Sequence, residues 1–108
     1  MVDEEELIEF SVRLLLSDQR DARRLVHALV SGWPEAGAQE LVFILSATAG
    51  TAEHMLAGPE VACAAQDVWR MAGLVGVDIY MMQLMGLPAE TAADLMAYWQ
   101  VHDRFFLG

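Results

Sequence analysis

Apolar side chains recur at helical spacing along nearly the whole chain, and no strand-like alternation of useful length interrupts them. The helical pattern breaks only at short segments that contain Gly, Pro, Ser or Asp, the residue types that end one helix and cap the next. These breaks divide the chain into five expected helices, at about residues 4–16, 18–30, 34–57, 59–85 and 88–105. Because short connections favour antiparallel neighbours, the sequence predicts an all-α, compact bundle of about five helices with a hydrophobic central fourth helix.

The chain has the length and composition of one globular domain. Its 108 residues are enough for a single hydrophobic core, so we expect one helical domain over residues 1–108. A hydrophobic content of 56% excludes a disordered chain. The longest uncharged apolar runs, 41–52 and 79–89, are shorter than the ~20 residues of a membrane-spanning helix, so no membrane partner is expected.

The N-terminal segment and the cysteine content indicate a cytoplasmic protein. The first ten residues, MVDEEELIEF, are acidic where a secretory leader is basic. Cys63 is the single cysteine, which excludes an internal disulfide and fits a reducing compartment. The absence of lysine beside abundant alanine and arginine is typical of a GC-rich bacterial genome.

The charge balance limits the partners. Six arginines oppose sixteen acids, which gives a formal charge of −10. Such a surface repels the phosphate backbone, so no nucleic acid is expected as a partner. A basic protein partner remains compatible with this charge.

Two helix junctions resemble each other in sequence. GWPEAGAQEL at 32–41 is similar to GLPAETAADL at 86–95. An internal duplication is one explanation. Helix punctuation is the other: Gly ends a helix and Pro begins the next at its first position. The flanking segments DARRLVHALV and AGLVGVDIYM do not match, which favours punctuation without excluding duplication.

The C-terminal half of the expected fourth helix is apolar nearly all round. Leu74, Asp78, Met81 and Met85 share one side at about 100° per residue, and other apolar residues occupy the opposite faces. A helix of this kind is either the buried centre of a bundle or is covered by another chain. Gly73 and Gly76, like Gly50 in the third helix, leave a bend or break possible.

Asp78 is the one acid in this apolar stretch. Its neighbours three and four positions away are Leu74, Val75, Met81 and Met82, so no basic residue of the same helix faces it. Three interpretations follow: an acid at the solvent edge or a subunit interface, a buried partner of an arginine, or a functional-site residue. A buried carboxylate needs a partner or a proton.

The expected second helix carries the only local concentration of positive charge. Guanidinium groups bind carboxylates and phosphates, so an anionic ligand is one hypothesis for this side. The alternative is a solvated face compensated by Glu4, Glu5, Glu6 and Glu9. The residues concerned are Arg20, Arg23, Arg24 and His27.

No catalytic motif was found. The nucleophile elbow, the phosphate loop and the dinucleotide fingerprint are missing, so an enzyme is the weaker hypothesis and no cofactor is expected. His27, His54 and His102 lack the spacing of metal ligands, and Cys63 has no local zinc partner. No metal site is therefore predicted.

The surplus of methionine and aromatic residues gives the main functional hypothesis, because such residues are enriched at adaptable interfaces. We expect a helical protein-interaction module that self-associates as a homodimer, with a possible adaptor or regulatory role toward a basic partner. The predicted interface residues are Trp69, Leu74, Asp78, Met81, Met82, Met85, Trp99, Phe105 and Phe106.

The alternative hypothesis is a small-molecule site, in which an apolar, Met-lined pocket holds a ligand that Asp78, His102 or an arginine fixes. The candidate ligand-binding residues are Arg20, Arg23, Arg24, His27, Asp78 and His102.

Overall fold

The computed structural model describes residues 3–16, 21–55 and 59–107, and these form an all-α molecule. The prediction of five helices is confirmed. The elements are α1 (Glu4–Leu16), α2 (Ala22–Gly32), α3 (Ala38–Met55), α4 (Pro59–Leu84), α5 (Ala92–His102) and a 3₁₀ turn, η1 (Phe105–Leu107). The expected end of the third helix at residue 57 lies outside the described residues. The second helix was expected to start at about residue 18, but α2 begins at Ala22, after the extended cap residue Asp21.

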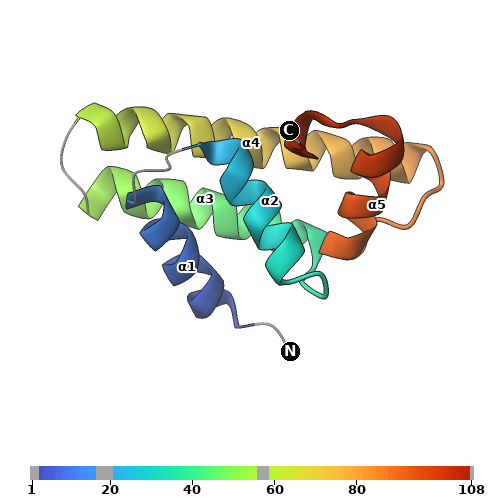
Figure 1. Ribbon diagram of the computed structural model, residues 1–108, viewed down its shortest axis with the longest axis horizontal. Coiled ribbons are helices and arrows are strands. Elements are labelled where there is room, and N and C mark those ends of the chain that lie inside the picture. The colour runs from blue at the N-terminus through green and yellow to red at the C-terminus, as the bar shows by residue number, and fades with distance from the viewer. Residues whose placement is uncertain (1–2, 17–20, 56–58, 108) are drawn as a thin grey trace.

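The two longest helices, α3 and α4, set the shape of the molecule. They lie side by side along its longest dimension, and α3–α4 is the most extensively contacted pair of elements (Figure 1). The helices α1 and α2 pack across this pair, and α5 lies near the end at which α4 finishes (Figure 1). The radius of gyration of 13.3 Å is close to the ~13 Å of a compact chain of this length.

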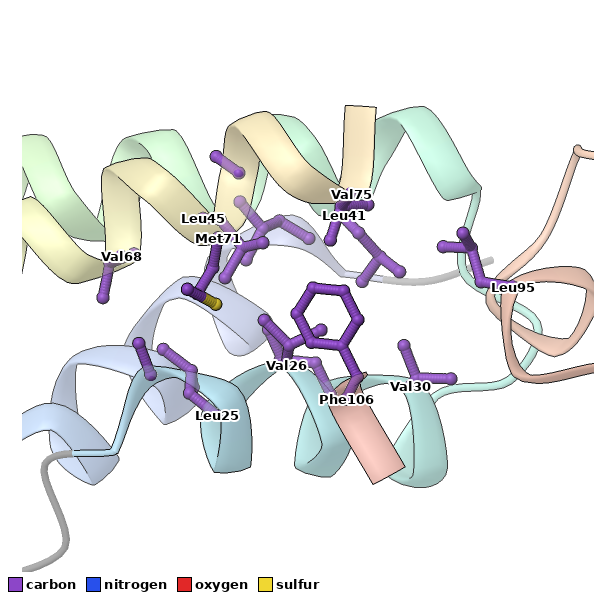
Figure 2. Packing of buried hydrophobic residues seen from close by; sticks show 14 of the residues in the cluster. Leu25, Val26, Val30, Leu41, Leu45, Val68, Met71, Val75, Leu95 and Phe106 are labelled. Carbon is purple, nitrogen blue, oxygen red and sulfur yellow. The ribbon is translucent and has the colours of Figure 1, made fainter. Parts of the chain in front are cut away.

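The core is formed where α2 and η1 meet the α3–α4 pair. Val26 and Val30 of α2 face Leu41 of α3 and Val75 of α4, and the ring of Phe106 lies among them (Figure 2). All five side chains are buried. Residues at helical spacing on several elements thus bury one face each, as the amphipathic pattern requires.

Two prolines do not begin helices, which corrects the expected starts of the third and fifth helices. Pro59 does begin α4, but α3 begins four residues after Pro34 and α5 begins four residues after Pro88. Each of these two helices begins just after a cap residue whose backbone amide donates to an acid three residues further along the chain. Glu40 Oε1 accepts from the Gly37 amide at 2.9 Å, and Asp94 Oδ2 accepts from the Thr91 amide at 3.1 Å. Thr91 completes a capping box by accepting from the Asp94 amide.

The two similar junctions pair with each other. Gly37 and Thr91, which occupy equivalent positions in the two sequences, form an antiparallel bridge. The Ala38 amide donates to the Glu90 carbonyl at 2.8 Å, and the Ala92 amide donates to the Ala36 carbonyl at 2.7 Å. The two junctions therefore exchange equivalent backbone hydrogen bonds, and these bonds join the start of α3 to the start of α5.

The helices α3 and α4 continue without a break through Gly50, Gly73 and Gly76. One side of α4 is buried against its neighbours, through Val68, Met71, Val75, Ile79 and Met82. The opposite side of α4 is exposed and also apolar. None of the described helices combines the length and the hydropathy that crossing a bilayer requires.

Candidate functional site

The exposed side of α4 carries a continuous set of large apolar residues. Three of them are more than half exposed: Val77 at 55%, Tyr80 at 60% and Leu84 at 63%. We call this surface the α4 face, which consists of Trp69, Leu74, Val77, Tyr80, Met81, Leu84 and Met85. On an ideal helix these positions cover the arc opposite the buried residues.

The C-terminal half of the α4 face has no exposed charge. An ion pair between Arg70 and Asp67, 3.2 Å apart, marks its N-terminal limit. From residue 71 to residue 86 the only charged side chain is Asp78, which is buried. This uncharged stretch extends over about 24 Å at 1.5 Å per residue.

The area of the α4 face is comparable with that of the largest apolar patches on ordinary monomers. Its seven side chains are each roughly half exposed. At ~200 Å² for a large side chain they present on the order of 700 Å², whereas the largest patch of a typical monomer covers about 300–600 Å². Patches of this size generally mark an interaction surface.

The structure divides the predicted interface residues between the surface and the core. Trp69, Leu74, Met81 and Met85 belong to the α4 face. Phe105 is also exposed, but it lies in η1 beside α2. Four of the predicted residues are in the interior and do not contribute to an exposed surface of this fold: Asp78, Met82, Trp99 and Phe106.

Sequence reasoning missed Val77, Tyr80 and Leu84, the most exposed members of the α4 face. The signal was present, because these three apolar residues follow one another at three- and four-residue spacing and therefore share one side of a helix. The predicted interface was instead centred on the side of α4 that carries Asp78. In the structure Asp78 lies at the border of the buried side of α4.

Asp78 is buried and bonded to an aromatic side chain. Its Oδ2 accepts a hydrogen bond from Trp99 Nε1 at 2.8 Å, which links α4 to α5. Burial raises the pKa of Asp78, the Trp99 bond partly offsets this, and the negative charge of Asp103 adds to the rise. Among the described residues no arginine forms an ion pair with Asp78, which corrects the interpretation of a buried arginine partner.

An apolar cavity lies between the end of α4 and α5. It has a volume of about 180 Å³, and its lining includes Met82, Tyr98, Val101 and His102. The rings of Tyr98 and His102 are 5.2 Å apart. The cavity is smaller than the ~300–1,000 Å³ of usual ligand pockets, and Asp78 does not line it. The geometry therefore gives little support to the Met-lined small-molecule pocket.

A second, polar cavity lies between α2 and the C-terminal segment. It has a volume of about 460 Å³ and is lined by Asp21, Arg23, Arg24, His27, Phe106 and Leu107. It therefore brings together three of the candidate ligand-binding residues. Arg20 lies outside the described residues, and His102 lines the other cavity.

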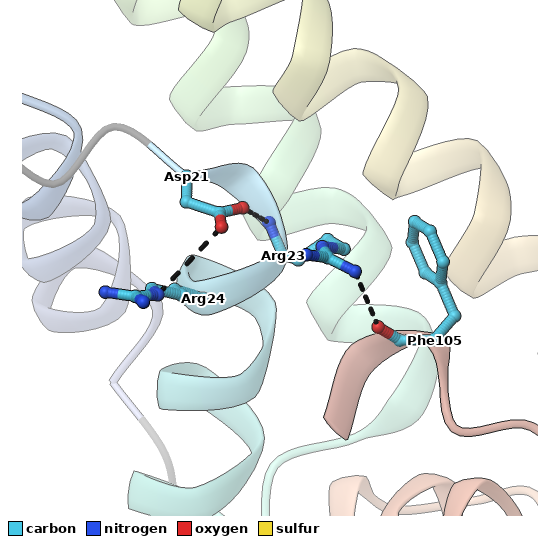
Figure 3. Close-up of polar contacts among 4 residues, drawn as sticks. All are labelled: Asp21, Arg23, Arg24 and Phe105. Carbon is cyan, nitrogen blue, oxygen red and sulfur yellow. Dashed lines mark hydrogen bonds and ion pairs between the residues drawn. The ribbon is translucent and has the colours of Figure 1, made fainter. Parts of the chain in front are cut away.

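The polar contacts of this second cavity are shown in Figure 3. Asp21 caps α2 by accepting from the Arg23 amide at 2.9 Å, and its other oxygen is 3.9 Å from Arg24 Nε. The Arg23 guanidinium donates to the Phe105 carbonyl at 3.5 Å and lies 5.2 Å from the centre of the Phe105 ring. Of the four acids expected to compensate this cluster, Glu9 pairs with Arg13 of its own helix instead.

Comparison of the chain with protein-family models, curated proteins and solved structures gives no match. Within the described part of the chain, no three His, Cys, Asp or Glu side chains gather in a way that suits a metal ion. Function is therefore inferred from the chemistry of the α4 face and of the two cavities.

Proposed function

We propose that the protein is a helical interaction module that forms a homodimer through the α4 face. The observation that carries this proposal is the exposed, uncharged half of α4 in a chain of formal charge −10. The exposed acids next to this side of α4, Asp67 and Glu53, lie at its N-terminal end, where Glu53 accepts a hydrogen bond from the Trp69 indole at 2.7 Å. Excluding water from several half-exposed large side chains favours association, at roughly 25 cal/mol for each Å² of apolar surface.

The absence of charge on the α4 face favours a second copy as its occupant. A basic partner would need carboxylates to pair with, and the exposed positions from residue 71 to residue 86 supply none. A second copy brings the same uncharged surface, and a twofold interface requires such a self-complementary patch. The available ~700 Å² is close to the ~800 Å² that each partner buries in a standard-size interface. The acidic surface elsewhere is the part of the dimer that suits a basic protein partner in an adaptor role.

The residue order suggests an antiparallel pairing of the two α4 helices. Val77 lies midway between Trp69 and Met85, so a twofold axis near Val77 pairs Trp69 with Met85 and Leu74 with Tyr80 of the other copy, and it places Leu84 opposite Arg70. This register places Met81 of one copy opposite Gly73 of the other. A Cβ added at Gly73 would have no atom within 4 Å, so this position offers open space for a methionine side chain.

Matched charge substitutions at two helix ends test the proposal. Leu84 and Leu16 are both exposed leucines at the last position of a helix, but only Leu84 belongs to the α4 face. The Leu84→Lys variant loses apolar contact in both copies and brings a positive charge toward Arg70 of the other copy, which should cost roughly 2–4 kcal/mol and raise the dimer Kd at least thirtyfold. The Leu16→Lys variant should leave this Kd unchanged.

Sedimentation equilibrium of the wild type and both variants measures these constants. Circular dichroism checks that each variant remains helical. Equal dimer constants for Leu84→Lys and the wild type would place the contact elsewhere on the molecule and overturn the proposed interface.

A further inference from the structure

We propose that the polar cavity between α2 and η1 is a binding site for a small organic oxyanion, a phosphate or carboxylate group attached to an apolar body. This proposal is independent of self-association, because none of the residues lining the cavity belongs to the α4 face.

Three positively chargeable side chains line this cavity. Arg23, Arg24 and His27 lie within little more than one turn of α2, and all three line the same concave surface. Among the described residues, the ion pairs Arg13–Glu9 and Arg70–Asp67 are formed on single helices outside this cavity. Guanidinium groups present several donors to one oxyanion, which is why arginine clusters recognise phosphate and carboxylate.

The shape of the cavity adds a second requirement. Its volume of about 460 Å³ lies within the ~300–1,000 Å³ of small-molecule sites and is larger than a lone inorganic anion needs. Phe106 and Leu107 form an apolar wall of the cavity, and because Phe106 is buried, an apolar group attached to the anion would contact chiefly Leu107. This wall comes from the C-terminal segment, which Arg23 holds through the Phe105 carbonyl and ring.

Asp21 is the acidic residue among the described residues that line the cavity, and a substitution at this position tests whether the cavity binds an anion. One carboxylate oxygen of Asp21 caps α2 and the other lies near Arg24. An asparagine at this position retains the cap, because Asn and Asp are equally good N-cap residues. The Asp21→Asn variant therefore removes a negative charge that opposes anion binding while α2 keeps its start.

Titration calorimetry with phenyl phosphate, benzoate, inorganic phosphate and neutral benzyl alcohol tests the site on the full-length protein. We expect saturable binding of phenyl phosphate or benzoate, weaker binding of inorganic phosphate and none of benzyl alcohol. Tighter binding of phenyl phosphate identifies a phosphate ligand, and tighter binding of benzoate identifies a carboxylate.

Three variants connect the binding to the cavity. Arg24→Gln should weaken binding about tenfold, since it removes a charge-assisted hydrogen bond to the anion. Asp21→Asn should strengthen binding about threefold or more, because a like charge is removed from the site. Arg13→Gln, a single charge removed outside the cavity, should change it little. Absence of saturable binding, or equal effects of Arg24→Gln and Arg13→Gln together with no gain from Asp21→Asn, would overturn the proposal.

Discussion

Asp78 is a polar residue in the most apolar part of α4, and its partner comes from another helix. The Trp99 indole, 21 residues later in the chain, donates to the carboxylate inside the core. The sequence predicted that a buried Asp78 needs such a partner, but it could not identify Trp99. Partner choice depends on where α5 packs against α4, and helical periodicity carries no information about that contact.

The raised pKa of Asp78 makes a directional prediction about stability and pH. Burial, the larger cause, raises the pKa from the ordinary value of 3.8, so the folded state holds the proton more tightly than the unfolded state. Ionisation of Asp78 therefore opposes folding. Its cost is absent below the ordinary pKa, grows as the pH rises, and is complete above the raised pKa.

The Asp78→Asn variant keeps an oxygen that accepts from Trp99 but carries no charge. Its free energy of unfolding, relative to the wild type, should therefore rise with pH through this window and then level off. Urea denaturation of both proteins from acidic to neutral pH measures the difference, in which the other titrating groups cancel. A difference that falls with rising pH would show that the ionised Asp78 stabilises the fold.

At the scale of elements, the sequence predicted the number of helices and the bounds of α1 and α4 closely. The starts of α3 and α5 were placed too early, because Pro34 and Pro88 were taken as first helical residues. In the structure both prolines precede a short loop, and the helices begin where an acid three residues ahead reaches back to the cap. The pairing of the two junctions is a contact between distant segments, which the local pattern did not indicate.

Removing the Thr91 cap should destabilise the protein. Thr91→Ala deletes the hydroxyl that accepts from the Asp94 amide at the start of α5, and the loss of such a cap costs about 1 kcal/mol. Thr51→Ala, the matched change inside α3, should be neutral or slightly stabilising, since Ala is the better helix former. Chemical denaturation compares the two variants. Equal unfolding free energies would show that the capping box contributes nothing measurable.

For the whole molecule, the sequence predicted that one helix carries more apolar surface than a single core covers. It did not predict which arc of α4 faces outward, because that depends on the positions of α2 and α3. Trp69 and Met85 accordingly lie on the α4 face, whereas Met82 and Trp99, equally plausible by composition, are inside. The polar cavity was likewise predicted only in part. The sequence placed its arginines on one side of the second helix, but the apolar wall of the cavity comes from residues about eighty positions later, and the local pattern did not indicate that contact.

The molar mass of the unmodified protein in solution is the most direct test of the central claim, that the α4 face is covered by a second copy. Light scattering on a size-exclusion column, over a range of loading concentrations, gives this mass. We predict a species of twice the 11.9 kDa chain mass at tens of micromolar, dissociating on dilution. A single species of 11.9 kDa at every concentration would contradict the account.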